Sequence, residues 1–203
     1  MREDFENPAW RETAVNPHDT PLSARGLRQA GDVAEALRGE GIRAVFSSPF
    51  LRALQTAHPA AEACGVPVFV EPGLSEWLNP EWFPAPPRWL TPGEMSARFP
   101  RVDTSYEPAV VPDFPEPSET RDVFDRVGRT MRLLLDRYPE GDIALFAHGA
   151  SLAQSIAGLV GGLEGVDLRT ASITTVAISP AGASLLASGS SHLRDTDDHL
   201  RFH

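Results

Sequence analysis

The stretch IRAVFSSPFLRALQTA, residues 42–57, decides the fold class of this 203-residue chain. Residues 42–46 form a short β-branched and aromatic run, which is typical of a buried strand. The Ser-Ser-Pro sequence at 47–49 ends that strand, and helix-forming residues follow over 50–63. Residues 66–70 predict the next strand. Because a strand, a helix and a second strand follow one another, the stretch indicates a βαβ unit in a mainly parallel sheet.

The same alternation of helices and strands continues on both sides of this unit. A helix capped by Ser23 is predicted upstream, ending at Gly39 or Gly41. Its core face is expected to consist of Leu27, Ala30, Val33, Ala34 and Leu37. A second helix is predicted over 118–138, with an inward face of Val123, Val127, Met131 and Leu134. The remaining elements are a strand over 142–147, a helix over 150–160 and a closing hairpin of 172–179 and 183–188. We therefore predict one α/β domain over residues 1–203, a three-layer sandwich with a mainly parallel central sheet.

The composition excludes several classes of protein. The chain carries 18 basic and 28 acidic residues, a net charge of −10, which argues against nucleic acid or an anionic membrane as the main partner. Its single cysteine, Cys64, excludes an internal disulfide and a thiolate metal cluster. The charged start MREDFENPAW lacks the apolar core of a signal peptide, and no run of residues is long enough to span a membrane. A cytoplasmic protein is therefore predicted.

Residues 72–117 differ in composition from the rest of the chain and are predicted to be an insertion. Eleven of the chain's 19 prolines lie here, together with Trp77, Trp82 and Trp89. One short helix is predicted from Thr91, where Thr-Pro-Gly-Glu fits a capping box with proline in the first helical position. Long irregular segments of this kind often form the lid or wall of a functional site. A loosely attached loop is the alternative, but three tryptophans favour packing against the domain.

Three polar residues follow predicted strands, at the edge where α/β proteins bind ligands. Arg52 lies in the first turn of its helix, where a guanidinium and free backbone N–H groups suit a phosphate oxygen. Glu76 lies between apolar neighbours, and partial burial raises the pKa of a carboxyl group, as a general acid requires. His148 follows the strand in ALFAHGAS, residues 144–151. Taken singly, each residue also fits a role without catalysis: a surface arginine, a solvated glutamate or a hydrogen-bonded structural histidine.

Motifs along nearly the whole chain carry a family resemblance. They are Arg2 and Asp4-Phe5 with Trp10, Pro21-Leu22-Ser23 through Gly26 and Gln29-Ala30, Ser48-Pro49 through Arg52, Gln55-Thr56-Ala57, Ser75-Glu76-Trp77, Trp89 to Met95, Val102 to Tyr106, Ser118-Glu119 with Arg126, and Ala147-His148-Gly149. In this order they resemble the histidine phosphatase superfamily, which has the phosphoglycerate mutase-like fold. Within it, the chain is most similar to the branch containing ecdysteroid-phosphate phosphatase and the Sts/TULA-type tyrosine phosphatases.

The resemblance implies hydrolysis of phosphomonoesters through a phosphohistidine intermediate, without a metal or a cofactor. Arg2, Arg52 and a protonated His148 would bind the phosphate oxygens, because a transferring phosphoryl group mainly requires positive charge around it. Glu76 would protonate the leaving oxygen. The substrate would be a phosphorylated small molecule or a phosphotyrosine-type group. A bulky apolar leaving group would suit the aromatic residues Trp77, Trp82, Phe83 and Trp89. A monomer and a homodimer both fit the sequence.

One motif of the family is absent from these 203 residues: the nucleophile sequence Arg-His-Gly at the end of a first strand. Family members have one residue after that motif and then an arginine, which Arg2 matches. We therefore interpret the chain as truncated just before Met1, with its first strand missing, its nucleophile histidine immediately upstream, and no activity by itself.

Three other functions compete with this interpretation. The first is a catalytically dead phosphate- or protein-binding protein of the same fold. The second is a mutase, which the Trp- and Pro-rich segment disfavours. The third is a serine hydrolase using Ser151, although its Gly-Ala-Ser-Leu-Ala sequence lacks the last glycine of a nucleophile elbow.

Overall fold

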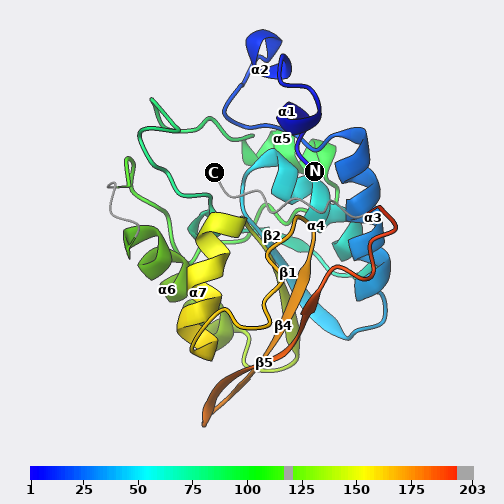
Figure 1. Ribbon diagram of the computed structural model, residues 1–203, viewed down its shortest axis with the longest axis vertical. Helices are drawn as coiled ribbons and strands as arrows, with labels where there is room; N and C mark the ends of the chain where they lie inside the picture. The colour runs from blue at the N-terminus through cyan, green and yellow to red at the C-terminus, as the bar shows by residue number, and fades with distance from the viewer. Residues whose placement is uncertain (117–120, 196–203) are drawn as a thin grey trace.

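The computed structural model describes residues 1–116 and 121–195, which form three layers (Figure 1). The helices are α1 Glu3–Glu6, α2 Trp10–Thr13, α3 Ala24–Leu37, α4 Leu51–Cys64, the 3-10 turn η1 Pro72–Leu74, α5 Pro92–Arg98, α6 Arg121–Arg137 and α7 Gly149–Val160. The strands are β1 Ile42–Ser47, β2 Val68–Val70, β3 Asp142–Phe146, β4 Ile173–Ser179 and β5 Gly182–Gly189. The first three form a parallel sheet in the order β2-β1-β3. Helices α3 and α4 lie on one side of this sheet, and α6 and α7 lie on the other.

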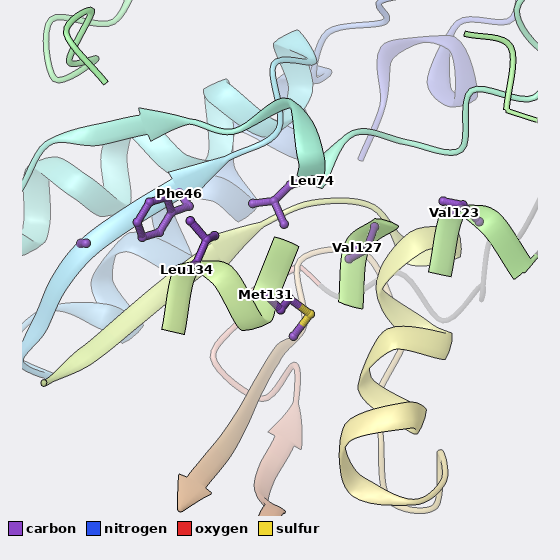
Figure 2. Packing of buried hydrophobic residues seen from close by; sticks show 7 residues of the cluster. Phe46, Leu74, Val123, Val127, Met131 and Leu134 are labelled. Carbon is purple, nitrogen blue, oxygen red and sulfur yellow. The ribbon is translucent and has the colours of Figure 1, made fainter. Parts of the chain in front are cut away.

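Side-chain alternation along β1 builds the two cores of the sandwich. Ala44 and Phe46 belong to a buried cluster with Val127 and Leu134 of α6 (Figure 2). Val45, between them, belongs to a second cluster with Leu54 and other residues of α4. Because successive side chains of a strand point to opposite faces, β1 requires a helical layer on each side. The predicted α/β fold class and the parallel sheet are confirmed.

Every predicted helix and strand is present within the described residues, although the predicted start of α6 at 118 lies outside them. Ser23 caps α3 by accepting a hydrogen bond from the N–H of Gly26, as expected. The prediction that Leu27 lies in the core is wrong, because its side chain is 50% exposed. Gly26 takes the inward position of this first turn instead. A Cβ atom there would lie 2.1 Å from the carbonyl oxygen of Met1, so only glycine allows this close approach.

The described sheet is divided into two parts. Within residues 1–116 and 121–195, β3 pairs with β1 alone, and β4 and β5 form a separate antiparallel hairpin. Residues before α3 contribute no strand, only an isolated bridge between Arg2 and Leu22. The apolar side chains of β3 from Ile143 to Phe146 are only partly buried, which is unusual for a strand of a parallel sheet.

The Trp- and Pro-rich segment is anchored to the domain, so the alternative of a loosely attached loop is wrong. Its main anchor is Glu71, a fully buried carboxylate directly after β2. This carboxylate accepts hydrogen bonds from the Tyr106 hydroxyl and from the backbone N–H groups of Gly73, Ala109 and Val110. Four donors satisfy a buried carboxylate without a cation. The capping box at Thr91 is present as predicted.

No helix in the described part of the chain combines the length and the apolar character needed to cross a bilayer.

Candidate active site

The carboxyl ends of β1 and β3 bring two distant segments of the chain together. The strands are parallel neighbours, with Ser47 opposite Phe146. After β1 the chain turns into α4, which carries Arg52 in its first turn. After β3 it reaches His148, the N-cap residue of α7. The N-terminal ends of two helices therefore lie beside these two side chains, and such ends favour anions.

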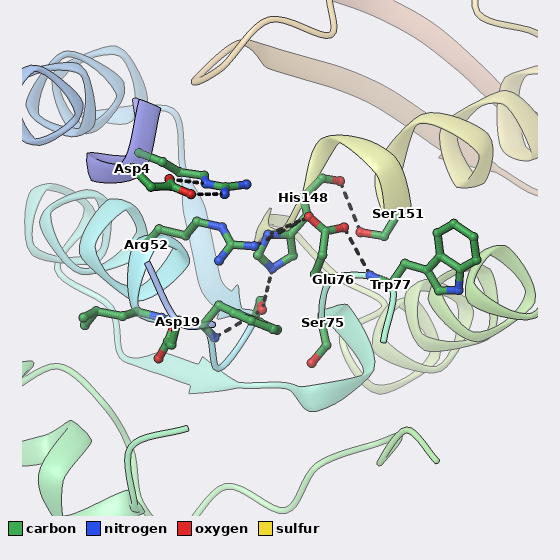
Figure 3. A network of polar contacts seen from close by, with 12 residues as sticks. Asp4, Asp19, Arg52, Ser75, Glu76, Trp77, His148 and Ser151 are labelled. Carbon is green, nitrogen blue, oxygen red and sulfur yellow. Dashed lines mark hydrogen bonds and ion pairs between the residues drawn. The ribbon is translucent and has the colours of Figure 1, made fainter. Parts of the chain in front are cut away.

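Arg52 and His148 converge on one carboxylate oxygen of Glu76 (Figure 3). The Oε2 atom of Glu76 lies 3.5 Å from Nη2 of Arg52 and 3.6 Å from Nδ1 of His148. All three side chains are largely buried: 12% of Arg52, 14% of Glu76 and 3% of His148 are exposed. Three residues that the sequence suggested from separate strand ends therefore share one small site. A phosphate oxygen at the position of this oxygen could contact both the Arg52 guanidinium and the His148 ring.

Arg2 lies at the edge of this site and is already engaged. Its guanidinium donates two hydrogen bonds to the carboxylate of Asp4, at 3.0 and 2.6 Å, and its Cζ lies 4.4 Å from the centre of the Phe5 ring. Arg11 binds the same carboxylate. The charge of Arg2 nevertheless lowers the pKa of both Arg52 and His148, so it acts on the same site.

The surroundings of His148 disfavour the charged form of its imidazole. Burial is the main cause that lowers its pKa well below the usual range, and the charges of Arg52, Arg126 and Arg2 lower it further. In the site without phosphate, this shift favours the neutral imidazole, and the protonated His148 expected for the phosphate-bound site stays a prediction. The Phe50 ring contacts the imidazole edge to face, with centroids 5.1 Å apart.

Arg52 keeps its charge despite burial. Burial lowers its pKa to about 10, partly opposed by Glu76 and Asp19. Its Cζ lies 4.6 Å from the centre of the Phe50 ring, which adds a cation–π contact. One aromatic ring thus supports both phosphate-binding candidates.

A buried arginine that the sequence marked only as part of a motif fixes the loop that carries Glu76. Arg126, from α6, donates hydrogen bonds to the backbone carbonyls of Gly73, Ser75 and Glu76. It also forms a buried ion pair with Glu116, whose carboxylate accepts from the N–H of Leu78. The motif residues Ser118 and Glu119, named together with Arg126, lie outside the described residues.

The aromatic residues around the site divide into two groups. Trp77, which follows Glu76 in the chain, meets Trp82 edge to face with ring centroids 5.3 Å apart, and its indole points away from Arg52 and His148 toward the core cluster of α6 (Figure 3). Phe83 was expected to face a leaving group, but it is buried against Phe50 and Leu78. It therefore belongs to the core beneath the site, because Phe50 needs an apolar partner on its far side.

Ser151 has a structural role in the described contacts. Its hydroxyl is fully buried in the first turn of α7 and donates to the carbonyl oxygen of His148 at 3.1 Å. A serine nucleophile needs a histidine ring as its base and an open approach. The structure thus offers no support for the serine hydrolase alternative.

Asp19 is a second buried carboxylate of this region that sequence reasoning missed. Its Oδ1 accepts a hydrogen bond from the N–H of Leu51 at 2.7 Å, so it caps α4, whose N-cap residue Phe50 has no polar side chain. The only available signal was its place just before the Pro-Leu-Ser motif of residues 21–23.

We expect Asp19 to make the stability of the chain depend on pH between about 4 and 6. Burial is the main cause that raises its pKa from 3.8 to about 6, so the folded state keeps a proton that the unfolded state releases. The stability from this group is therefore complete at low pH and is lost as pH rises through about 6. Relative to the native chain, Asp19→Asn should gain up to about 3 kcal/mol of unfolding free energy from pH 4 to 7. Urea unfolding at a series of pH values measures this difference.

Asp103→Asn is the matched control for that experiment. Hydrogen bonds from Ser105 lower the pKa of Asp103, so its variant should lose stability relative to the native chain as pH rises. Equal slopes for the two variants would contradict the assignment of Asp19.

The sequence of the chain matches a known protein family and several curated relatives. The profile of the histidine phosphatase superfamily (branch 1) matches residues 7–190. Human ubiquitin-associated and SH3 domain-containing protein A is 31% identical over 167 residues, which cover 78% of this chain and 24% of that protein. The probable phosphoglycerate mutase GpmB of Yersinia enterocolitica is 33% identical over 147 residues, covering 70% of this chain and 65% of that protein.

A solved structure shares the fold. The ecdysone phosphate phosphatase from Bombix mori, in complex with tungstate, matches with a TM-score of 0.59 and 27% sequence identity. The match covers 78% of this chain and 61% of that chain. The chain spans only about a quarter of the length of the first curated relatives that it matches.

Proposed function

This chain belongs to the histidine phosphatase superfamily, and from that membership we propose that it hydrolyses phosphomonoesters through a phosphohistidine intermediate. The observation that carries the proposal is the convergence of Arg52 and His148 on one oxygen position. A transferring phosphoryl group spreads negative charge over its three equatorial oxygens, and buried donors aimed at those oxygens stabilise it strongly.

Each residue of the site has a role in this reaction. Arg52 and the N–H of His148 would bind phosphate oxygens, with Arg2 adding positive charge at the edge. A histidine nitrogen attacks phosphorus while the bond to the leaving oxygen breaks, and protonated Glu76 gives its proton to that oxygen. Water then attacks the phosphohistidine with Glu76 as its base, which releases phosphate and restores the free histidine.

His148 is assigned to phosphate binding, so the reaction needs a second histidine as its nucleophile. None of the other described histidines lies at the site. His18 lies against Phe83, His58 against Glu62 and Phe99, and the ring of His192 against the carbonyl of Ala171. We propose that the nucleophile lies on a strand encoded just before Met1, which pairs with β3. Three observations support this: among the residues that the structure describes, β3 pairs with β1 alone, the apolar residues of β3 are only partly buried, and Arg2 takes the place of the arginine that follows the family motif.

Two experiments test the position of the nucleophile. Translation of the upstream DNA in the same frame should give an apolar strand ending in Arg-His-Gly. A chain extended by those residues should hydrolyse p-nitrophenyl phosphate with inhibition by vanadate, and form an acid-labile phosphohistidine, whereas the 203 residues alone should not. A stop codon or an unrelated upstream sequence would contradict the proposal.

A phosphate- or protein-binding protein without activity is the second candidate. The observation that favours it is that the described residues hold phosphate-binding groups but no second histidine at the site. In that case the 203 residues would bind tungstate, and no extension encoded upstream would give turnover. A mutase is less favoured, although relatives from three Yersinia species are named probable phosphoglycerate mutases. Transfer of phosphate to a second hydroxyl rather than to water would identify it.

Replacing Glu76 with Gln in the active, extended chain should separate substrates by leaving group. Esters of alkyl alcohols should be hydrolysed ~10²-fold more slowly or worse, because a general acid is lost. Activated aryl phosphates, whose leaving groups need no proton, should hardly change. Steady-state kinetics with the two ester classes measures this, and equal losses on both would assign Glu76 a purely positional role.

The substrate class follows from the groups beside the site. We propose a phosphotyrosine-type group or a small apolar phosphate ester, because the loop that follows Glu76 carries the aromatic pair Trp77 and Trp82, a composition that suits an apolar leaving group. The ecdysone phosphate phosphatase in the comparison supports an apolar small molecule. A panel of phosphopeptides and apolar phosphate esters, ranked by kcat/KM on the extended chain, distinguishes the two.

A further inference from the structure

A buried serine reaches the ring of His148 from the other strand end. The hydroxyl of Ser48 lies 2.8 Å from Nε2 of His148, across 100 residues of sequence. Both side chains are buried, and Ser48 is fully inaccessible to solvent. Ser48 itself is fixed by a backbone hydrogen bond from its N–H to the carbonyl of Phe146. The contact therefore belongs to the junction of β1 and β3. The reaction proposed above assigns no role to Ser48.

The surroundings determine which nitrogen of the imidazole carries the proton. On one side of the ring, Nδ1 faces the carboxylate of Glu76, which is an acceptor when ionised. On the other side, the Ser48 oxygen already accepts a weak hydrogen bond from the N–H of Phe50 at 3.4 Å. Its own proton is then free to point at Nε2. A neutral imidazole has one donor and one acceptor nitrogen, so the Ser48 hydroxyl favours a bare Nε2. The Glu76 carboxylate favours a proton on Nδ1 as long as it is ionised, that is, before it takes up the proton that it gives to the leaving oxygen.

We propose that Ser48 is a positioning residue that fixes His148 in the tautomer with its proton on Nδ1. A neutral imidazole can then donate a hydrogen bond to a phosphate oxygen without first taking up a proton from solvent. The opposite tautomer would present a lone pair to the anion and repel it. This inference rests on the proposed function, because the hydrogen bond to phosphate that it explains belongs to the proposed phosphate-binding site.

Nuclear magnetic resonance of the 203-residue chain tests the tautomer directly. In ¹⁵N-histidine-labelled protein, a protonated and a bare ring nitrogen have well separated chemical shifts, and His148→Gln identifies the signals of His148. The native chain should show a protonated Nδ1 and a bare Nε2. A proton on Nε2 in the native chain would overturn the proposal. The readout requires no turnover, so it stands even if the protein proves to lack phosphatase activity.

Variants of Ser48 then test the cause. Ser48→Ala should reduce the tautomer preference to what Glu76 alone supplies, and it should weaken tungstate binding about 10-fold, the value of one hydrogen bond. Ser47→Ala is the matched control, because Ser47 is equally buried beside it and donates instead to the carbonyl of Ser48. It should keep both the native tautomer and the native affinity.

A nearly isosteric variant covers the case in which Ser48→Ala fails to fold. Ser48→Cys keeps the buried shape with a weaker donor, so its Nε2 signal should shift toward a mixture of tautomers. An unchanged tautomer and unchanged tungstate affinity in a folded Ser48 variant would overturn the role of the hydroxyl.

Discussion

Replacing Arg52 with Gln should reduce hydrolysis by the extended chain by about 10³-fold or more, the scale at which single arginines act in phosphoryl transfer. The guanidinium is held in place by α4 and by the Phe50 ring, and it lies within 3.5 Å of the oxygen position that it shares with His148. Burial strengthens its attraction for an anion, because little water competes there. Tungstate binding by the 203-residue chain should weaken in parallel, which calorimetry can measure without turnover.

Two control variants show whether the loss in Arg52→Gln comes from the charge and shape of this particular guanidinium. Arg52→Lys keeps the charge but loses the planar fork, so its activity should lie between those of the native chain and Arg52→Gln. Arg38→Gln removes an arginine that pairs with Glu35 on the surface of the domain, and it should leave activity unchanged. Equal tungstate affinity for native chain and Arg52→Gln would refute the assigned role of Arg52.

Replacing Arg126 with Met should cost about 3–5 kcal/mol of unfolding free energy, the range found when one partner of a buried ion pair is removed. The change leaves the Glu116 carboxylate buried without its cation and leaves the carbonyls of Gly73, Ser75 and Glu76 without a donor. The loop approaches α6 too closely for a rearrangement to be easy: a Cβ on Gly73 would lie 2.3 Å from Oγ1 of Thr130. Urea unfolding measures the loss.

A double variant separates the two contributions of Arg126. Combining Arg126→Met with Glu116→Gln removes the unpaired buried charge, so it should recover part of the stability. It should not recover all of it, because the backbone carbonyls remain unpaired and the loop that carries Glu76 remains unsupported. In the extended chain, a folded Arg126 variant should also lose activity against esters with poor leaving groups, the same loss that is expected for Glu76→Gln. Full stability in Arg126→Met alone would show that the network is dispensable.

Local patterns in the sequence predicted most of the elements and part of the site. The cap at Ser23, the capping box at Thr91 and the alternation along β1 all depend on residues within a few positions of one another. The positions of Arg52 and His148 followed from the same logic, since parallel strands end at one edge of a sheet. The sequence alone was sufficient to expect a phosphate site at that edge.

The tertiary structure decided how the site is supported and in which direction the pKa of its histidine is shifted. Ser48 reaches His148 across 100 residues, and Arg126 reaches the loop of Glu76 across about 50, so no local pattern could reveal either contact. The lowered pKa of His148 depends on burial together with three arginines from three separate segments. Electrostatic effects of this kind act through space and depend on the local dielectric environment, which exists only once the layers have packed.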